Sequence, residues 1–130
     1  MPMKPFTLRY GKGSVSFELP AERVATVVTG KNVPAVANLE AAFLRALDRP
    51  IDSAPLGSMV RPGETVAIAV SDITRVWQQN DRTLPLLLNY LNRVGVPDEN
   101  IRVIIAVGGH RQNTESEFVE ICSPEVCHRV

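Results

Sequence analysis

The sequence has few of the features that mark secreted, membrane-spanning or nucleic-acid-binding proteins. It contains only two cysteines, and residues 1–9 lack the apolar core of a secretion signal. No apolar run approaches the roughly 20 residues that a membrane-spanning helix needs. We therefore expect a cytoplasmic protein with no membrane partner, in a reducing compartment where the cysteines need not be paired.

No charge sign is in excess, because 14 Lys and Arg residues balance 14 Asp and Glu residues. This balance argues against nucleic acid or an anionic membrane surface as a partner, and it is compatible with a local charged pocket. What the chain does have is a composition that is 45% hydrophobic and 22% charged, which is typical of a globular protein. Its 130 residues contain no low-complexity tract or visible linker, so we predict one domain over residues 1–130.

The chain is organised around two apolar runs that each end in polar residues. Val66–Arg75 reads VAIAVSDITR, and Arg102–Arg111 reads RVIIAVGGHR. Short runs of β-branched and small apolar residues are typical of buried parallel strands, and polar endings of this kind are typical of functional loops. Between them, Gly95 ends a stretch with one apolar stripe at helical spacing, which consists of Leu84, Leu87, Leu88, Leu91 and Val94.

A strand, a helix and a second strand form a crossover that is right-handed in nearly all proteins and leaves the two strands parallel. Both C-terminal strand ends then lie at one edge of the sheet, where open α/β sheets bind ligands. The sequence therefore predicts an α/β fold with a Rossmann-like parallel or mixed sheet, helices on its faces and an N-terminal β-hairpin.

The N-terminal hairpin is predicted at Phe6–Leu19, where apolar and polar residues alternate on both sides of a turn. The turn, Gly11–Ser14, joins two strands and lacks the second half of a phosphate-binding loop, so we do not expect phosphate to bind there. A short strand is expected at Val24–Val28, followed by a helix that Asn38 caps and Pro50 ends.

Further boundaries follow from proline and capping residues. Because proline is tolerated in the first turn of a helix, Pro85 places the cap of the central helix at Asp81 or Thr83. A capping box at Thr114–Glu117 predicts the start of a last helix. The mixed apolar and polar residues before Val130 suit the start of another strand.

The first strand ending contains Asp72 and Arg75, three residues apart. The planar guanidinium of Arg75 is suited to binding a carboxylate or phosphate through two hydrogen bonds, and Asp72 can fix its orientation. From the spacing alone, a plain surface ion pair between the two residues explains the pattern equally well.

The second strand ending contains Gly108, Gly109 and His110. Two glycines allow a ligand to approach the backbone closely, and an imidazole can give or take a proton near neutral pH. A lone histidine in a loop is more often merely solvated, but neighbouring strands at ~4.8 Å spacing would bring His110 together with Asp72 and Arg75. An acid or base beside an anion clamp suits a small hydroxy or keto acid.

Two other groups of residues carry less information about function. Cys122, Cys127 and His128 lack a fourth ligand and a second cysteine pair, so we predict no metal site there. Trp77 either lines the pocket or covers the sheet edge, and the sequence alone does not separate these two roles.

Several stretches form a joint pattern, namely PGETVAIAVSDITR at Pro62–Arg75, GVPDENIRVIIAVGGHR at Gly95–Arg111, and the pairs Asn80-Asp81, Leu84-Pro85 and Thr114-Glu115. Together with Tyr10–Gly13 of the hairpin they resemble the N-terminal part of the lactate racemase family, which uses a nickel-pincer nucleotide. The resemblance covers nearly the whole chain, and the joint occurrence of SDITR with a Gly-His-Arg loop is fairly specific.

The resemblance implies a racemase or epimerase of 2-hydroxy acids, in which hydride leaves C2 of the substrate for the nickel-pincer nucleotide and returns on either face. Carried onto this sequence, Arg75 would hold the substrate carboxylate, His110 would act as acid and base on the hydroxyl, and Asp72 would support Arg75. These roles agree with the residue chemistry, since hydride loss from a carbinol requires removal of the hydroxyl proton.

The family pattern differs here at Val76, where proline is usual, and at Gly109, where threonine is usual, so the particular hydroxy acid stays open. The second catalytic histidine, the cofactor-bearing lysine and the nickel-binding histidine of the family would lie beyond residue 130, and His128 is not expected to replace them. The resemblance therefore implies a substrate-binding N-terminal domain or fragment of a longer two-domain enzyme, inactive alone, with its own C-terminal domain as partner. The alternative is a non-enzymatic α/β domain that binds a small anionic metabolite.

Overall fold

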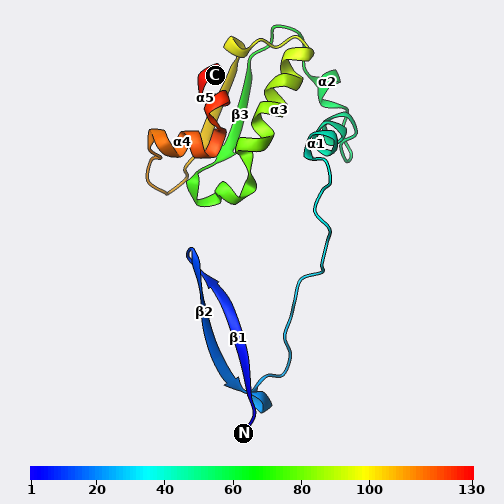
Figure 1. Cartoon of the computed structure of the whole chain (residues 1–130). Helices are drawn as coiled ribbons and strands as arrows, with labels where there is room; N and C mark the ends of the chain where they lie inside the picture. Colours follow the sequence, from blue (N-terminus) through cyan, green and yellow to red (C-terminus); the bar gives the residue numbers. More distant parts are fainter. The chain divides into compact units, whose positions relative to one another are not determined.

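A computed structural model describes all residues from Met1 to Val130. The chain forms two compact units, Met1–Ala35 and Val36–Val130 (Figure 1). The smaller unit contains a β-hairpin, and the larger unit contains a pair of parallel strands with all the α-helices. None of these helices combines the length and the apolarity that crossing a bilayer requires.

In the smaller unit, β1 (Met3–Tyr10) and β2 (Gly13–Pro20) pair along their whole length in antiparallel orientation. Gly11 in the turn has a φ of 56°, a left-handed conformation that glycine adopts without strain. Phe6 and Phe17 lie directly opposite each other, and their rings stack with centroids 5.6 Å apart. Such cross-strand pairs stabilise a hairpin, and the predicted hairpin is confirmed.

The strand predicted at Val24–Val28 is wrong. A short 3-10 helix, η1 (Ala21–Arg23), follows β2, and the valine-rich segment after it has no regular structure. The hairpin strands pair only with each other, so this segment has no neighbouring strand to complete its backbone hydrogen bonds. The preference of valine for strands does not by itself produce one without a partner.

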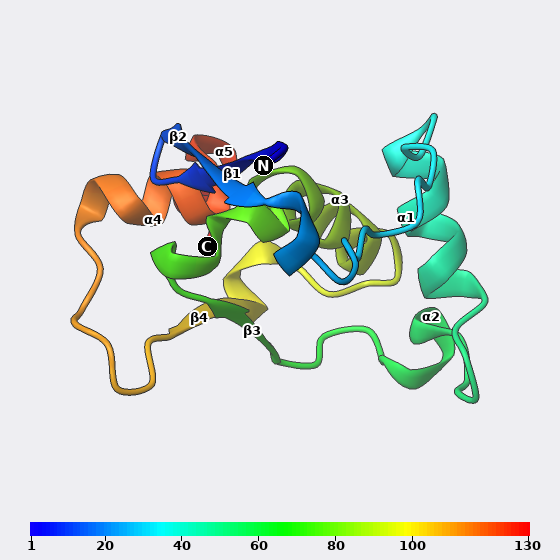
Figure 2. The same ribbon diagram turned by 90° about the horizontal axis from the view of Figure 1, so that it is seen from below.

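In the larger unit, β3 (Val66–Ser71) and β4 (Ile101–Ala106) lie side by side in parallel, with every residue of one strand opposite a residue of the other. The helix α3 (Asn80–Arg93) connects them. Figure 2 shows this larger unit from a second direction, with the two strands adjacent in that view as well. The predicted strand, helix and parallel strand are confirmed, and with them the α/β class.

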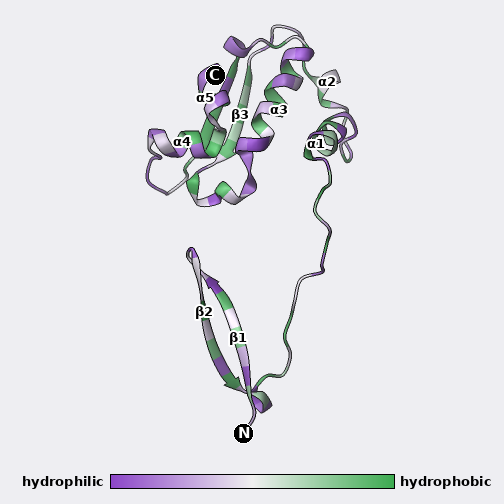
Figure 3. Cartoon of the chain, in the orientation of Figure 1, coloured by the Kyte–Doolittle hydropathy of each residue, from purple (hydrophilic) through white to green (hydrophobic).

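The helices bury one face of the two-stranded sheet and leave the other face open. On the open face Ala67 and Ala69 are exposed, and Ile104 is 53% exposed. Figure 3 shows mostly hydrophobic residues along both strands. Each fully buried leucine contributes ~1.5–3 kcal/mol to the stability of such a core. The core consists of Val70, Leu84, Leu88, Leu91, Val96, Ile101, Ile121, Cys122 and Val126.

The helix α3 begins earlier than the sequence predicts. A 3-10 helix, η2 (Ile73–Gln78), follows β3 in place of the expected loop, and Gln79 with a φ of 58° turns the chain directly into α3. Asp81 and Thr83 therefore lie inside the helix, and Pro85 lies in its second turn. The hydrogen bond that Pro85 lacks is a local cost, and burial of the apolar face of α3 outweighs it.

Two short helices attach to α3 through a tyrosine that the sequence analysis did not single out. They are α1 (Leu39–Asp48), capped by Asn38 as predicted, and α2 (Leu56–Met59). The hydroxyl of the buried Tyr90 donates to Oδ1 of Asp48 at 2.9 Å and accepts from the backbone N–H of Gly57 at 3.1 Å. Desolvation and the neighbouring Asp48 carboxylate raise the pKa of Tyr90, so this phenol stays neutral.

The chain ends in a helix, and the strand expected there is wrong. The helix α4 (Glu115–Cys122) has the predicted capping box, and α5 (Pro124–Arg129) follows directly. Ser123 caps α5, and proline in its first turn is pre-organised for a helix. Arg129 then donates to Oδ2 of Asp98 at 2.9 Å and to Asn92 at 2.7 Å, which fixes the end of α5 against α3 and the short 3-10 helix η3 (Asp98–Asn100).

Gly95 ends α3 at a position where no other residue fits. Its φ is 94°, and a Cβ there would lie 2.8 Å from Cβ of Pro62. Its carbonyl also accepts a hydrogen bond of 2.8 Å from the N–H of Gly63. The turn before β3 and the end of α3 are thereby held together.

Candidate functional site

The end of β3 places a buried carboxylate. Asp72 is only 2% exposed and caps η2, with Oδ1 accepting from the hydroxyl of Thr74 at 2.6 Å and from its N–H at 3.2 Å. The hydrogen bond from the Thr74 side chain, followed by the one from His110, lowers the pKa of Asp72 against the opposing effect of burial. Asp72 is therefore ionised at neutral pH.

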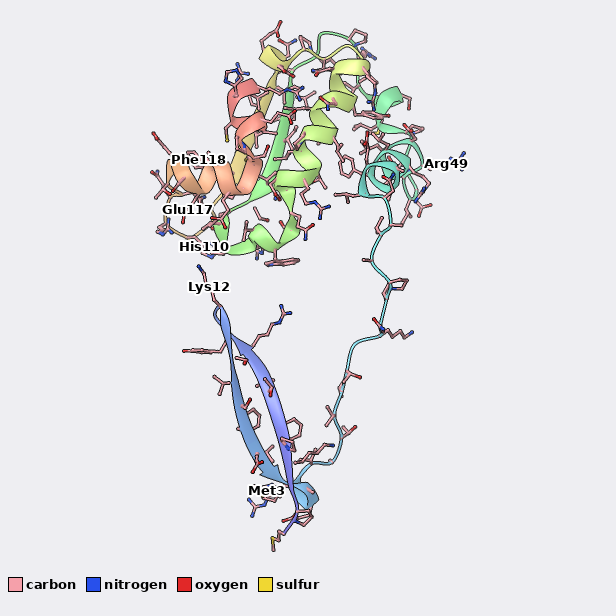
Figure 4. All side chains as sticks on the ribbon, in the orientation of Figure 1. Met3, Lys12, Arg49, His110, Glu117 and Phe118 are labelled. Carbon is pink, nitrogen blue, oxygen red and sulfur yellow. The ribbon has the colours of Figure 1, made fainter.

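The end of β4 brings an imidazole to this carboxylate. Gly108 has a φ of 58°, and the N–H of His110 donates to the carbonyl of Val107 at 3.0 Å, so the chain turns sharply here. Nδ1 of His110 lies 2.5 Å from Oδ2 of Asp72. The ring is otherwise accessible, since its side chain is 51% exposed, and its position at this end of the larger unit is labelled in Figure 4.

This geometry fixes what the imidazole can do. A carboxylate at Nδ1 favours a proton on that nitrogen, so Nε2 of the neutral ring keeps its lone pair. Nε2 of His110 has no hydrogen-bond partner in the chain. Nε2 of His110 can therefore take a proton and return it.

Arg75 lies in η2, three residues after Asp72, and its side chain is exposed with no hydrogen bond or ion pair. Only its backbone N–H contacts Asp72, donating to the carbonyl at 3.0 Å. The structure thus differs from the predicted support of Arg75 by Asp72, because the carboxylate oxygens bind Thr74 and His110 instead. The guanidinium stays available to a ligand.

The sequence analysis missed several residues that hold this arrangement. Oδ1 of Asn113 accepts from the N–H of Ile73 at 3.3 Å, which ties the loop after β4 to the start of η2. Arg111 forms a bidentate pair with Glu117 at 2.6 and 2.8 Å. That guanidinium, followed by the backbone of Thr114, lowers the pKa of Glu117 to about 2.

Some of these contacts correspond to a local sequence pattern and others do not. Thr74 is two residues after an aspartate, which is the spacing of a turn closed by a side chain, so a D-x-T search would find it. Glu117 was predicted only as a capping residue. The partners of Arg111 and Asn113 depend on the path of the loop, and no local pattern indicates them.

The other residues considered for chemistry do not join the site. No group of three or more His, Cys, Asp or Glu side chains is placed to hold a metal ion. Cys122 and Cys127 are free thiols, and His128 lies on α5. Trp77 is 72% exposed on η2. The donor set of this chain therefore does not fit a nickel-bearing group by itself.

Comparison with known protein families identifies the class. The family described as the lactate racemase N-terminal domain matches residues 10–130, and this chain belongs to it. The suspected resemblance is confirmed.

Particular relatives are lactate racemases. The chain is 32% identical over 118 residues to the lactate racemase of Thermoanaerobacterium thermosaccharolyticum, a match that covers 89% of this chain and 27% of the relative. It is 39% identical over 75 residues to the lactate racemase of Lactiplantibacillus plantarum, which covers 58% of this chain and 17% of the relative. The chain thus spans about a quarter or less of the length of these relatives.

Proposed function

We propose that this chain is the N-terminal, substrate-binding part of a longer, cytoplasmic, two-domain racemase or epimerase that acts on 2-hydroxy acids. The family and the short coverage of its relatives support this reading. The observation that carries it is the hydrogen bond of 2.5 Å between the buried carboxylate of Asp72 and the exposed imidazole of His110.

His110 is the acid and base on the substrate hydroxyl. Oxidation at the carbon of a hydroxy acid requires the hydroxyl proton to leave, and Nε2 of His110 accepts it. The imidazolium that forms is stabilised by the carboxylate of Asp72, which is ionised because the hydrogen bond from Thr74 and then that from His110 lower its pKa. On this face of the substrate the same nitrogen returns the proton, and the second histidine expected in the C-terminal domain would serve the opposite face.

Arg75 binds the substrate carboxylate. Its guanidinium is exposed, has no partner within the chain and follows the same strand end as Asp72. A planar fork of donors recognises a carboxylate through two parallel hydrogen bonds, which fixes the position of the neighbouring carbon. Asp72 is proposed to serve this site through its hydrogen bond to His110.

The cofactor is proposed to be a nickel-pincer nucleotide held by the C-terminal domain, because this chain lacks a metal-holding cluster. When bound, that group supplies an acceptor for the hydride of the substrate C2 and a donor for its return. The residues described here bind the substrate and move the hydroxyl proton only. We therefore expect no racemase activity from residues 1–130 alone.

The test is to replace His110 and Arg75 by alanine in the full-length protein and to follow the interconversion of 2-hydroxy acid enantiomers, beginning with lactate. His110→Ala should lower kcat by ~100- to 10,000-fold, the usual range for loss of a general acid and base. Arg75→Ala should mainly raise KM, and Arg75→Lys should restore only part of the loss, since lysine lacks the planar fork.

Matched controls are His128→Ala and Arg49→Ala. Both residues are exposed and lie outside the site, and neither has a side-chain hydrogen bond in the structure. Their kinetics should equal those of the unmodified protein. Unchanged kinetics in both His110→Ala and Arg75→Ala would contradict the proposal.

A further inference from the structure

A hollow of about 580 Å³ lies against the face of β4 that carries Val103 and Ile105. Its walls come from β4 and the loop after it, and from the helices α4 and α5, with no residue from β3. Phe118 on α4, one of its lining residues, is labelled in Figure 4. Cys122, Cys127 and Val130 also line it.

The lining of the hollow is mostly apolar. Burial raises the pKa of Cys122 to about 11, so this thiol stays neutral and behaves as an apolar wall. Nδ2 of Asn113 has no hydrogen-bond partner but is out of reach of solvent, so it does not face the open hollow.

The edge of β4 is unpaired as well. The sheet contains only β3 and β4, so the backbone groups of β4 that point away from β3 have no strand to bind. Exposed edges of this kind accept an added strand, with backbone hydrogen bonds along the edge and alternate side chains in pockets. An extended segment would use both features, since its backbone can pair with the edge and its apolar side chains can enter the hollow.

The position of α5 indicates where such a segment comes from. Nε of Arg129 donates to Asp98 at 2.9 Å, and η3 with Asp98 directly precedes β4, so the end of α5 lies beside the start of β4. Val130 itself lines the hollow. Chain that continues from Val130 would enter the hollow at the start of β4 and run parallel to it.

We propose that the hollow is the seat of a third parallel strand, formed by the segment that directly follows Val130 in the longer protein. The helices α4 and α5 then form the crossover from β4 to this strand, on the sheet face that α3 already covers. Successive right-handed crossovers that advance in one direction place their helices on one face, as observed. The inference rests on the proposal that the chain is part of a longer enzyme.

The test uses the full-length protein with the photo-crosslinking residue p-benzoylphenylalanine in place of Phe118. Irradiation and mass spectrometry should give a crosslink from position 118 to a peptide that begins within about ten residues after Val130 of the same chain, the length of a short loop and a strand. The same residue in place of Glu120, which is exposed on α4 and does not line the hollow, should give no such crosslink. A crosslink to a second copy, to a distant segment, or none in folded protein overturns the proposal.

A second measurement leaves the hollow unmodified. In the native full-length protein, alkylation of Cys127 should be at least about tenfold slower than alkylation of a cysteine introduced as Glu120→Cys, because the added strand covers it. Equal rates overturn the proposal. Racemase activity is assayed on the same samples: activity without the crosslink overturns the third strand alone, and the crosslink without activity overturns the proposed function alone.

Discussion

β3 and β4 are neighbours of equal length, six residues each, and their C-terminal ends differ in almost every physical respect. After β3 the chain enters η2 at once, and the capping Asp72 is 2% exposed with both oxygens hydrogen-bonded. After β4 the chain turns through Gly108 into an open loop, and the side chain of His110 is 51% exposed. One end fixes a charge, and the other presents a ring to solvent.

This difference indicates that the two strand ends have different roles. A buried carboxylate with lowered pKa is a fixed partner for the ring, while an exposed imidazole can reach a substrate and exchange protons with it. The loop after β4 needs its own supports because it lacks a buried cap, and Asn113 and the pair of Arg111 with Glu117 provide them.

Removing the charge at the end of β3 should have the largest effect. In the full-length protein, Asp72→Asn should lower kcat by roughly 100- to 10,000-fold, because an amide at Nδ1 no longer stabilises the imidazolium and favours the other tautomer. The measurement is steady-state enantiomer interconversion. Asp52→Asn, an exposed aspartate with no hydrogen bond, is the control and should be unaffected. Equal activity in both variants would mean that the carboxylate has no role in turnover.

Removing the hydrogen bond that positions Asp72 should have a smaller effect on kcat. Thr74→Val removes the hydroxyl that donates to Asp72 at 2.6 Å and keeps the side-chain shape, so kcat should fall by ~3- to 10-fold. The pKa of Asp72 should then rise, since this hydrogen bond is the largest cause of its lowering. Thr74→Ser should restore most of the activity. If Thr74→Val and Thr74→Ser behave alike, the hydroxyl does not position the carboxylate.

Removing the Arg111–Glu117 pair, which supports the loop after β4, should give the smallest effect. It should be visible as a pH dependence of the free energy of unfolding. The pKa of Glu117 is about 2 in the folded chain against an ordinary 4.5. Its stabilising effect is therefore fully present at neutral pH, declines as the pH falls below about 4.5, and is lost near pH 2. Denaturant unfolding at pH 7 and pH 3 should show a gap between the unmodified protein and Glu117→Gln that narrows at the lower pH. A gap that stays constant would assign the effect to packing.

Much of the fold was predictable because its signals are local. The apolar runs of β3 and β4, the leucine stripe of α3 and the capping box of α4 are periodic or short-range patterns, and the structure has each of them. The errors came where contacts between residues distant in the sequence determine the secondary structure. Val24–Val28 forms no strand because no partner strand is present, and α5 is fixed by Arg129 through contacts to residues 31 to 40 positions away.

The candidate site shows the same limit. The parallel crossover correctly placed Asp72 and His110 at one edge of the sheet, but their pairing spans 38 residues and depends on the strand register and the turn at Gly108. By spacing alone, Arg75 is the nearer candidate partner of Asp72. The two side chains do not pair, because the carboxylate of Asp72 instead caps η2. Roles in substrate binding for Arg75 and Asp72 stay predictions.

Gly95 has a consequence for how this protein can vary. Every other amino acid adds at least a Cβ, and that atom would press on Pro62 in the turn that leads into β3. A replacement at this position would displace the start of β3 relative to the chain that leads into β4. The two strands would then shift against each other, and so would the site residues at their C-terminal ends. In a saturation mutagenesis of the gene, we expect codon 95 to be as intolerant as the codons of the site residues, although it lies at the opposite end of the sheet.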